Sequence, residues 1–186
     1  MRRLIYLVGP PGSGKSTLMG ALIPPVWLRV FRDDQRMPRD ELFHADRLIG
    51  AELGRHRASF SGTDALAMNI HPHALRWIAT SHHPLVLGEG QRLGTRRFLE
   101  AARDSGRMVD LVWLDVPDQI CRLRRQARGS RQNPQWVKAA TTRAARLAEA
   151  AADMPGVRLH RIRDHGATHD IAVRLAADLR LTEVNW

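Results

Sequence analysis

The fold is decided by the stretch Gly9-Pro10-Pro11-Gly12-Ser13-Gly14-Lys15-Ser16-Thr17, which comes directly after the apolar run Leu4–Val8. Its glycines can adopt backbone angles that are closed to other residues, so the loop can curl until successive N–H groups point inward at an anion. The spacing G-x-x-x-x-G-K-S between a strand and a helix is typical of a loop that binds nucleotide phosphates. We therefore expect ATP or GTP to bind here.

The residues of this loop have different expected roles. Lys15 brings a positive charge to the phosphates, and the hydroxyl of Ser16 is placed to ligate Mg²⁺. The helix expected over Ser16–Leu22 directs the positive end of its dipole at the same phosphates. We expect the nucleotide to contact Gly9, Gly12, Ser13, Gly14, Lys15, Ser16 and Thr17, with Lys15 also catalytic. The alternative is a glycine-rich turn beside a surface lysine.

Length and composition indicate a single domain over residues 1–186. With 44% hydrophobic residues the chain has a globular composition and enough length for one buried core. Cys121 is the only cysteine, which excludes a disulfide framework and fits a reducing cytoplasm. The apolar run after Arg2 and Arg3 is too short for a secretory signal, and no run is long enough to span a membrane.

The net charge of +10 favours a polyanionic partner. Nearly all of the positive charge comes from arginine, because Lys15 and Lys138 are the only lysines. Nucleic acid, with DNA favoured, is the partner that this balance suggests. The alternative is that the arginines reflect genomic base composition and form a solvated surface.

Short apolar runs alternate with helical stretches, which predicts an α/β fold with a mostly parallel, five-stranded sheet flanked by helices. The expected strands are Leu4–Val8, Val26–Phe31, Leu85–Leu87, Val109–Leu114 and Val157–Ile162. The expected helices, after the one that follows Lys15, cover Pro38–Leu53, Thr63–Ser81, Thr95–Ser105, Asp118–Gly129, Pro134–Ala152 and Thr168–Leu181. Residues from about 39 to 81 exceed one crossover helix, so we expect a helical acceptor-binding insertion there.

A second group of candidate residues follows the second expected strand, in the sequence Arg32-Asp33-Asp34-Gln35-Arg36. Ligands of open α/β sheets gather at the carboxyl ends of strands. A carboxylate there could accept the proton of an attacking hydroxyl while an arginine holds an anionic group of the same acceptor. The alternative, which the sequence favours equally, is that Asp33 or Asp34 caps a helix.

An arginine-rich helix follows the fourth expected strand. Its arginines are Arg122, Arg124, Arg125, Arg128 and Arg131, and the nearest acidic residue is Asp118. Because residues four and about seven apart share a helix face, Arg124, Arg128 and Arg131 line up. Such a row would stabilise charge on a transferring phosphoryl group, so we expect a phosphate-facing lid over about 118–133. The alternative is a solvated face.

Three blocks of this sequence resemble those of the kinase domain of bacteriophage polynucleotide kinases. They are Gly9–Thr17, Arg32–Arg36 in the form Arg-Asp-Asp-x-Arg, and Asp115–Pro117, followed by Arg124 and Arg128-Gly129 in matching register. The similarity extends from about residue 2 to about residue 148. It implies a P-loop kinase fold and, if the protein is encoded by a phage, a location in the host cytoplasm.

The resemblance implies roles for individual residues. It makes Asp33 the residue that activates the acceptor hydroxyl and Arg36 the residue that contacts the acceptor's phosphate. It makes Arg128 a contact of the donor phosphates, with Arg124 in support. Glu89 stands where the family usually has an aspartate, and it could order Mg²⁺-bound water, orient the acceptor or cap a turn.

Three other features have more than one interpretation. Thr63 and Asp64 could contact an acceptor, or they could form a helix cap with an acidic first turn. Asp115 precedes Val116-Pro117, which favours a structural role. The histidines are His71, His73, His82 and His83. With no cysteine nearby, and with Pro72 and Pro84 indicating turns, they are expected at the surface rather than in a zinc site.

The leading hypothesis is a Mg²⁺-dependent kinase that transfers the γ-phosphate of a nucleoside triphosphate to a hydroxyl on nucleic acid. The hydroxyl would belong to a 5′ end or to a hydroxymethyluracil base in DNA, as in a related class of phage enzymes. The alternative acceptor is a free nucleoside, nucleotide or antibiotic-like molecule. A nucleic-acid-dependent ATPase is the third hypothesis. No residue indicates a choice between ATP and GTP, and nothing in the sequence indicates an oligomeric state.

Overall fold

The computed structural model describes residues 2–34, 36–54, 62–163 and 168–178. Its strands are β1 (Arg3–Val8), β2 (Leu28–Arg32), β3 (Arg39–His44), β4 (Arg47–Leu53), β5 (Leu85–Glu89), β6 (Met108–Leu114) and β7 (Val157–Ile162). Its helices are α1 (Lys15–Leu22), α2 (His71–Thr80), α3 (Arg96–Asp104), α4 (Asp118–Ala127), α5 (Pro134–Ala152) and α6 (Thr168–Asp178), with the 3₁₀ helix η1 at Gly62–Ala65. The described strands form one sheet of order β2-β3-β4-β5-β1-β6-β7.

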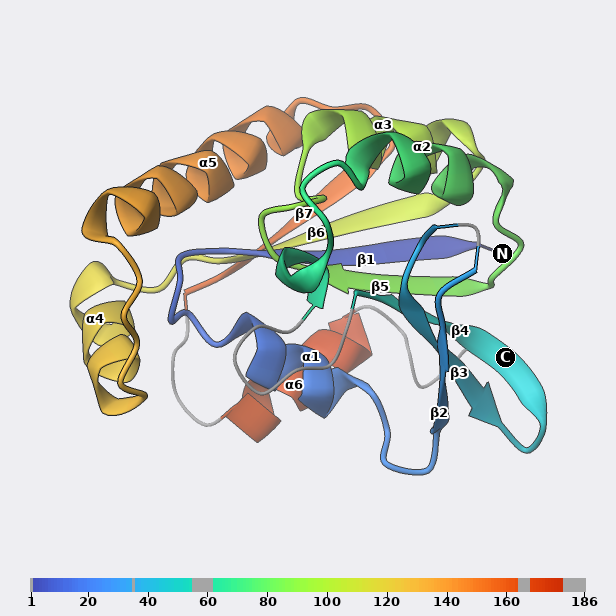
Figure 1. Ribbon diagram of the computed structural model, residues 1–186, viewed down its shortest axis with the longest axis horizontal. Coiled ribbons are helices and arrows are strands. Elements are labelled where there is room, and N and C mark those ends of the chain that lie inside the picture. The colour runs from blue at the N-terminus through green and yellow to red at the C-terminus, as the bar shows by residue number, and fades with distance from the viewer. Residues whose placement is uncertain (1, 35, 55–61, 164–167, 179–186) are drawn as a thin grey trace.

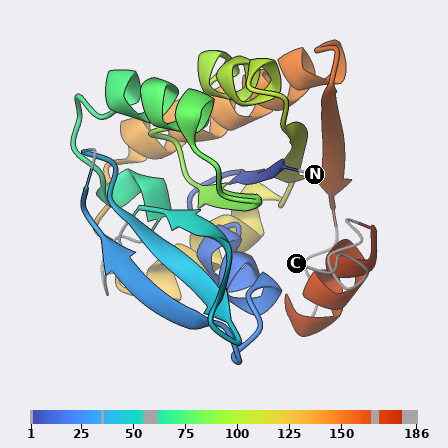
Figure 2. The ribbon, with the colours of Figure 1, turned by 90° about the vertical axis from the view of Figure 1, so that its right-hand side faces the viewer.

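Two layers of helices cover the sheet (Figures 1 and 2). Helices α2, α3 and α5 lie over one face, where side chains such as Tyr6, Phe98 and Leu111 form one core. Helices α1 and α6 lie over the other face, where Ile5, Leu7 and their neighbours form a second core. Every residue of β1 is buried, and its apolar run Leu4–Val8 is typical of a central strand covered on both faces. Helix α4 lies at the end of the sheet where β1 stops (Figure 1).

The expected mostly parallel α/β sheet is confirmed, but it has seven strands among the described residues rather than five. The helix expected over Pro38–Leu53 is wrong, because β3 and β4 form an antiparallel hairpin there. Its turn contains Ala45 and Asp46 at φ 47° and 60°. The local sequence Asp40-Glu41-Leu42 is compatible with a helix, but pairing with β2 and β5 and burial of Leu42 override that preference.

Other boundaries differ less from those expected. The single helix expected over Thr63–Ser81 divides into η1 and α2, so the region from 39 to 81 is not a helical insertion. Residues 55–61 of that region, and 179–181 at the end of the last expected helix, lie outside the described residues. The signals for α3 are confirmed, since Thr95 accepts a hydrogen bond from the Phe98 amide and Gly106 follows the helix at φ 82°. Among the described residues no helix combines the length and the apolar character needed to cross a membrane.

Asp110 of β6 is a fully buried carboxylate with basic partners on both neighbouring strands. It accepts hydrogen bonds from Arg3 Nε at 2.7 Å and Arg158 Nε at 2.9 Å, and it lies 2.8 Å from His160 Nε2. Burial alone would raise the pKa of Asp110, but hydrogen bonds from His160, Arg3 and Arg158 outweigh it and lower the pKa to about 2. The ionised carboxylate therefore joins β1, β6 and β7.

The stability that Asp110 contributes should depend on pH. Because its pKa is lower in the folded state, the contribution is complete well above pH 4 and is lost as the pH falls toward 2. We expect the difference in unfolding free energy between the wild type and Asp110→Asn to shrink by about 1 kcal/mol between pH 6 and pH 3. Urea unfolding of both proteins at the two pH values measures this change, and a constant difference contradicts the low pKa.

Candidate active site

The phosphate loop joins β1 to α1 as the sequence predicts. The chain leaves β1 after Val8, and Gly14 at φ 98° immediately precedes the first residue of α1, Lys15. The Lys15 ammonium donates hydrogen bonds to the carbonyls of Gly9 and Pro10, both at 3.0 Å, so it lies against the loop. Burial lowers the pKa of Lys15, and the nearby carboxylates Glu89 and Asp64 partly oppose that effect. The loop therefore holds a cation where an anion can reach it.

Glu89 lies at the end of β5, beside β1, and contacts the phosphate loop directly. Ser16 Oγ donates a hydrogen bond of 2.7 Å to Glu89 Oε1, and Glu89 is only 3% exposed. A hydroxyl and a carboxylate are the oxygen ligands that Mg²⁺ prefers, so these two residues fit a magnesium ion. Of the three interpretations of Glu89 made from sequence, this contact favours the one that involves Mg²⁺.

Residues of η1 pack closely around Glu89. Gly62 has φ 66°, and a Cβ at this position would lie 2.7 Å from Glu89 Oε1, so the close packing requires glycine. Thr63 is completely buried, and its hydroxyl donates to the Glu89 carbonyl at 2.8 Å. Tyr6 OH lies 2.8 Å from Thr63 Oγ1 and donates to the Gly90 carbonyl at 3.2 Å. These bonds fix the backbone that presents the Glu89 carboxylate.

Thr63 and Asp64 both make hydrogen bonds within the fold. Asp64 Oδ1 accepts hydrogen bonds from the backbone amides of Gln91 at 2.7 Å and Arg92 at 3.0 Å. The carboxylate thus caps the turn after β5. Sequence reasoning missed Tyr6, and the signal that could have found it is a single phenol within the aliphatic run of β1, since a buried hydroxyl needs a partner.

Helix α4 brings two arginines onto the phosphate loop. Arg124 donates to the carbonyl of Ser13 at 3.1 Å, and Arg125 donates to the carbonyl of Pro11 at 2.6 Å. Arg128 is exposed and bonds to the Arg124 carbonyl at 3.3 Å. Arg122 and Arg131 are also exposed. The structure therefore brings Arg124 to the loop as expected, places Arg125 beside it, and leaves Arg128 open to solvent.

Asp33 and Arg36 meet at a cavity of about 590 Å³. The described lining consists of Asp33, Arg36, Pro38, Ala65, Leu66, Ala67, Asn69, Ile70 and His73. This lining combines apolar walls with one carboxylate, one guanidinium, one carboxamide and one imidazole, and it includes no residue of the phosphate loop. Among the described residues no helix lies between β2 and β3, where Asp33 and Asp34 stand, so the helix-capping interpretation of these residues is wrong. The two candidate acceptor residues thus line one cavity.

Asp115, His71 and His83 have partners within the fold. Asp115 accepts two hydrogen bonds from Arg161, at 2.9 and 2.6 Å, which join the end of β6 to β7. His71 and His73 belong to α2, and Pro72 lies in the first turn of that helix rather than in the turn expected from sequence. His71 Nε2 lies 2.8 Å from Thr95 Oγ1. His83 is half-buried rather than at the surface, and burial lowers its pKa.

Comparisons with known proteins identify the family. A family model described as P-loop Nucleotide Kinase3 matches residues 1–169. A ribose 1,5-bisphosphate phosphokinase PhnN of Pseudomonas paraeruginosa is 31% identical over 163 residues, which cover 83% of this chain and 83% of that protein. The PhnN protein of Methylobacterium radiotolerans is 30% identical over 187 aligned positions, which cover 95% and 97% of the two chains. A shikimate kinase from Acinetobacter baumannii, solved with shikimate, aligns with a TM-score of 0.47 at 16% identity over 100% of this chain and 97% of its own.

These comparisons do not show the expected kinship with phage polynucleotide kinases. The match covers the phosphate loop, the carboxylate at the end of β5 and the arginines of α4 together. The chain belongs to the P-loop Nucleotide Kinase3 family of nucleotide-binding kinases.

Proposed function

We propose that this protein is an ATP-dependent kinase that phosphorylates a small, already phosphorylated acceptor, with ribose 1,5-bisphosphate as the first candidate. The observation that carries the proposal is the cavity of about 590 Å³ lined by Arg36 and Asp33. A cavity of this size with few polar groups suits a small molecule. The two PhnN relatives, which are named for ribose 1,5-bisphosphate, support the same class of acceptor.

The donor half of the proposed mechanism depends on the phosphate loop. The loop amides and Lys15 would hold the β- and γ-phosphates, and Arg124 supports the loop from α4. Ser16 and Glu89 are the residues that would hold Mg²⁺, which supplies charge neutralisation at the transferring phosphate. Arg128, exposed at the end of α4, would contact the donor phosphates from the solvent side, so that residues from about 118 to 133 act as a lid.

The acceptor half depends on Arg36 and Asp33. Arg36 would bind an anionic group of the acceptor, since a guanidinium forms paired hydrogen bonds with phosphate oxygens. Asp33 would accept the proton of an attacking hydroxyl while the new oxygen–phosphorus bond forms and ADP leaves. Phosphoryl transfer requires mainly positioning and charge stabilisation, and these residues would supply both.

A nucleic-acid acceptor is the second candidate because of the net charge of +10. The experiment offers γ-labelled ATP to four acceptors side by side: ribose 1,5-bisphosphate, a nucleoside mixture, a 5′-hydroxyl oligonucleotide, and hydroxymethyluracil DNA with blocked ends. We expect label in the first. Label in either nucleic acid, declining steeply as salt rises, would replace the proposal with the second candidate, and label only in free phosphate would indicate an ATPase.

Asp33→Asn tests whether the accepting atom is a hydroxyl oxygen. A hydroxyl must lose its proton, so removing the base should lower kcat by about a hundredfold. ATP affinity, measured by equilibrium titration, should stay unchanged because Asp33 lies outside the phosphate loop. A nearly normal kcat would contradict the role of Asp33 as a base and is expected if a phosphate oxygen of the acceptor, which carries no proton to remove, is the nucleophile.

A further inference from the structure

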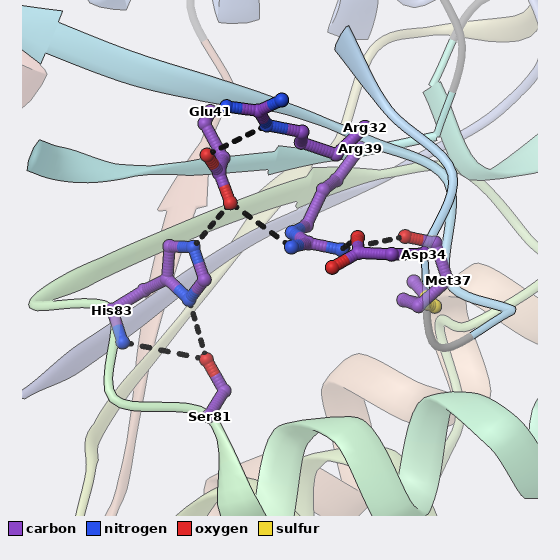
Figure 3. Close-up of polar contacts among 7 residues, drawn as sticks. All are labelled: Arg32, Asp34, Met37, Arg39, Glu41, Ser81 and His83. Atoms are coloured by element: carbon purple, nitrogen blue, oxygen red, sulfur yellow. Dashed lines mark hydrogen bonds and ion pairs between the residues drawn. The ribbon is translucent and has the colours of Figure 1, made fainter. Parts of the chain in front are cut away.

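Arg39, the first residue of β3, is a buried cation with carboxylate partners on two sides (Figure 3). It is only 4% exposed. Its Nη1 donates to Asp34 Oδ1 at 2.6 Å and to the Met37 carbonyl at 3.2 Å, and its Nη2 donates to Glu41 Oε1 at 2.9 Å. The guanidinium therefore donates hydrogen bonds to Asp34 and Met37, the two residues at the ends of one turn.

Arg39 and its partner Glu41 also contact α2 and the segment before β5. The guanidinium lies 5.4 Å from the centre of the Trp77 ring, a cation–π distance. His83 Nε2 lies 3.4 Å from Glu41 Oε1, and its Nδ1 lies 2.8 Å from Ser81 Oγ (Figure 3). Arg39 thus connects the turn to elements that are themselves packed into the core.

The turn held by Arg39 carries an unfavourable backbone conformation. Its two ends are joined by a hydrogen bond of 3.1 Å from the Met37 amide to the Asp34 carbonyl. Within it Arg36 has φ 53°, a left-handed conformation that costs energy for any residue with a Cβ. Such a conformation persists only where the surrounding contacts determine it, and it is often found where a side chain is held for binding.

We propose that Arg39 is a positioning residue that holds the Asp34–Met37 turn closed and thereby directs Arg36 into the acceptor cavity. The inference rests on the proposed function, because it takes the cavity to be the acceptor site. It assigns part of the acceptor affinity to Arg39, which is not among the residues that line the cavity. The pKa of Asp34 is lowered, chiefly by the hydrogen bond from Arg39, so the two remain an ion pair at neutral pH. Burial alone would raise the pKa of Glu41, but hydrogen bonds from Arg32 and Arg39 lower it.

The test uses Asp34→Asn and Arg39→Lys in the full chain. The Asp34 side chain is 58% exposed, so its replacement by the isosteric amide removes the charge on the turn without disturbing the core. Lysine at 39 keeps the charge but cannot place separate N–H groups on Asp34, Met37 and Glu41 together. The matched control is Asp104→Asn, whose side chain is 63% exposed and is likewise paired with an arginine, Arg103, but lies on α3.

We expect Asp34→Asn to raise the KM for the acceptor about fivefold and Arg39→Lys to raise it about tenfold, because the binding-competent turn is populated less often. The KM for ATP and the kcat at saturating acceptor should change less than twofold, and the control should change neither. If the KM for ATP rose as much as the KM for the acceptor, or if Asp34→Asn left the acceptor KM unchanged, the positioning role of Arg39 would be overturned. The proposed function would then still stand. A wild-type protein that transfers no phosphate to any small acceptor would overturn the proposed function and this inference together.

Discussion

Lys15→Met should lower the rate of phosphoryl transfer by about a thousandfold while the protein remains folded. The Lys15 ammonium lies against the Gly9 and Pro10 carbonyls, within the loop that is expected to surround the triphosphate. Methionine has a similar length but no charge, so the charge that develops on the transferring phosphate loses its main protein counter-charge. Single-turnover transfer from γ-labelled ATP measures the rate, and a thermal melt shows that the fold is retained.

The matched control for Lys15 is Lys138→Met. Lys138 is the one other lysine in the sequence and is exposed on α5. This variant should transfer phosphate at the wild-type rate. If Lys15→Met retained more than a tenth of the wild-type rate, the loop would not be the donor site that the sequence and the structure indicate.

Glu89→Gln should lower kcat by about a hundredfold and shift the Mg²⁺ titration to higher concentrations. The amide keeps a hydrogen-bonding oxygen for Ser16 and nearly the same volume beside Gly62. The negative charge that a divalent cation requires is lost. The measurement is initial rate against Mg²⁺ concentration at fixed ATP, because a metal-holding role predicts that high Mg²⁺ restores part of the rate.

Glu100→Gln serves as the control for Glu89. Glu100 is a partly exposed acid on α3, paired with Arg96 at 2.8 Å, and it lies outside the loop contacts. It should leave both the rate and the Mg²⁺ titration unchanged. A Glu89→Gln protein with a reduced rate but the wild-type Mg²⁺ titration would assign Glu89 to loop positioning rather than to the metal.

The donor half of the site could be predicted from sequence because its information is local. Gly9–Thr17 lie within nine consecutive positions, and the apolar run before them fixes the strand that precedes the loop. The end of β5 was also predictable in outline, since Glu89 follows a buried apolar run. Its bond to Ser16 was not, because the pair is separated by 73 positions in the chain.

Asp33 and Arg36 could be predicted as acceptor residues from their place after the second strand, but the rest of the cavity lining could not, because it depends on contacts between distant segments. The hairpin of β3 and β4 forms where local preference allowed a helix, and its pairing with β5 is what decides the outcome. Tyr6 and Thr63, which fix η1, are 57 positions apart. The resemblance to phage polynucleotide kinases correctly indicated a P-loop kinase, but the nucleic-acid acceptor that it implied is not supported by the family to which the chain belongs.

The order of strands in the sheet has a consequence for how such an enzyme could acquire a new specificity. Strands β2 and β3 reach the rest of the sheet only through β4, which pairs with β5 over three positions, from Gly50↔Leu85 to Glu52↔Leu87. Strand β1, which leads into the phosphate loop, pairs with β5 over five positions and with β6 over six. The segment from β2 to β4 is therefore joined to the rest of the sheet through a short stretch of strand pairing. Asp33, Arg36 and Pro38 of this segment line the cavity, so under the proposed function we expect that replacing the segment with a homologous one would change the acceptor and leave the phosphate loop unaltered.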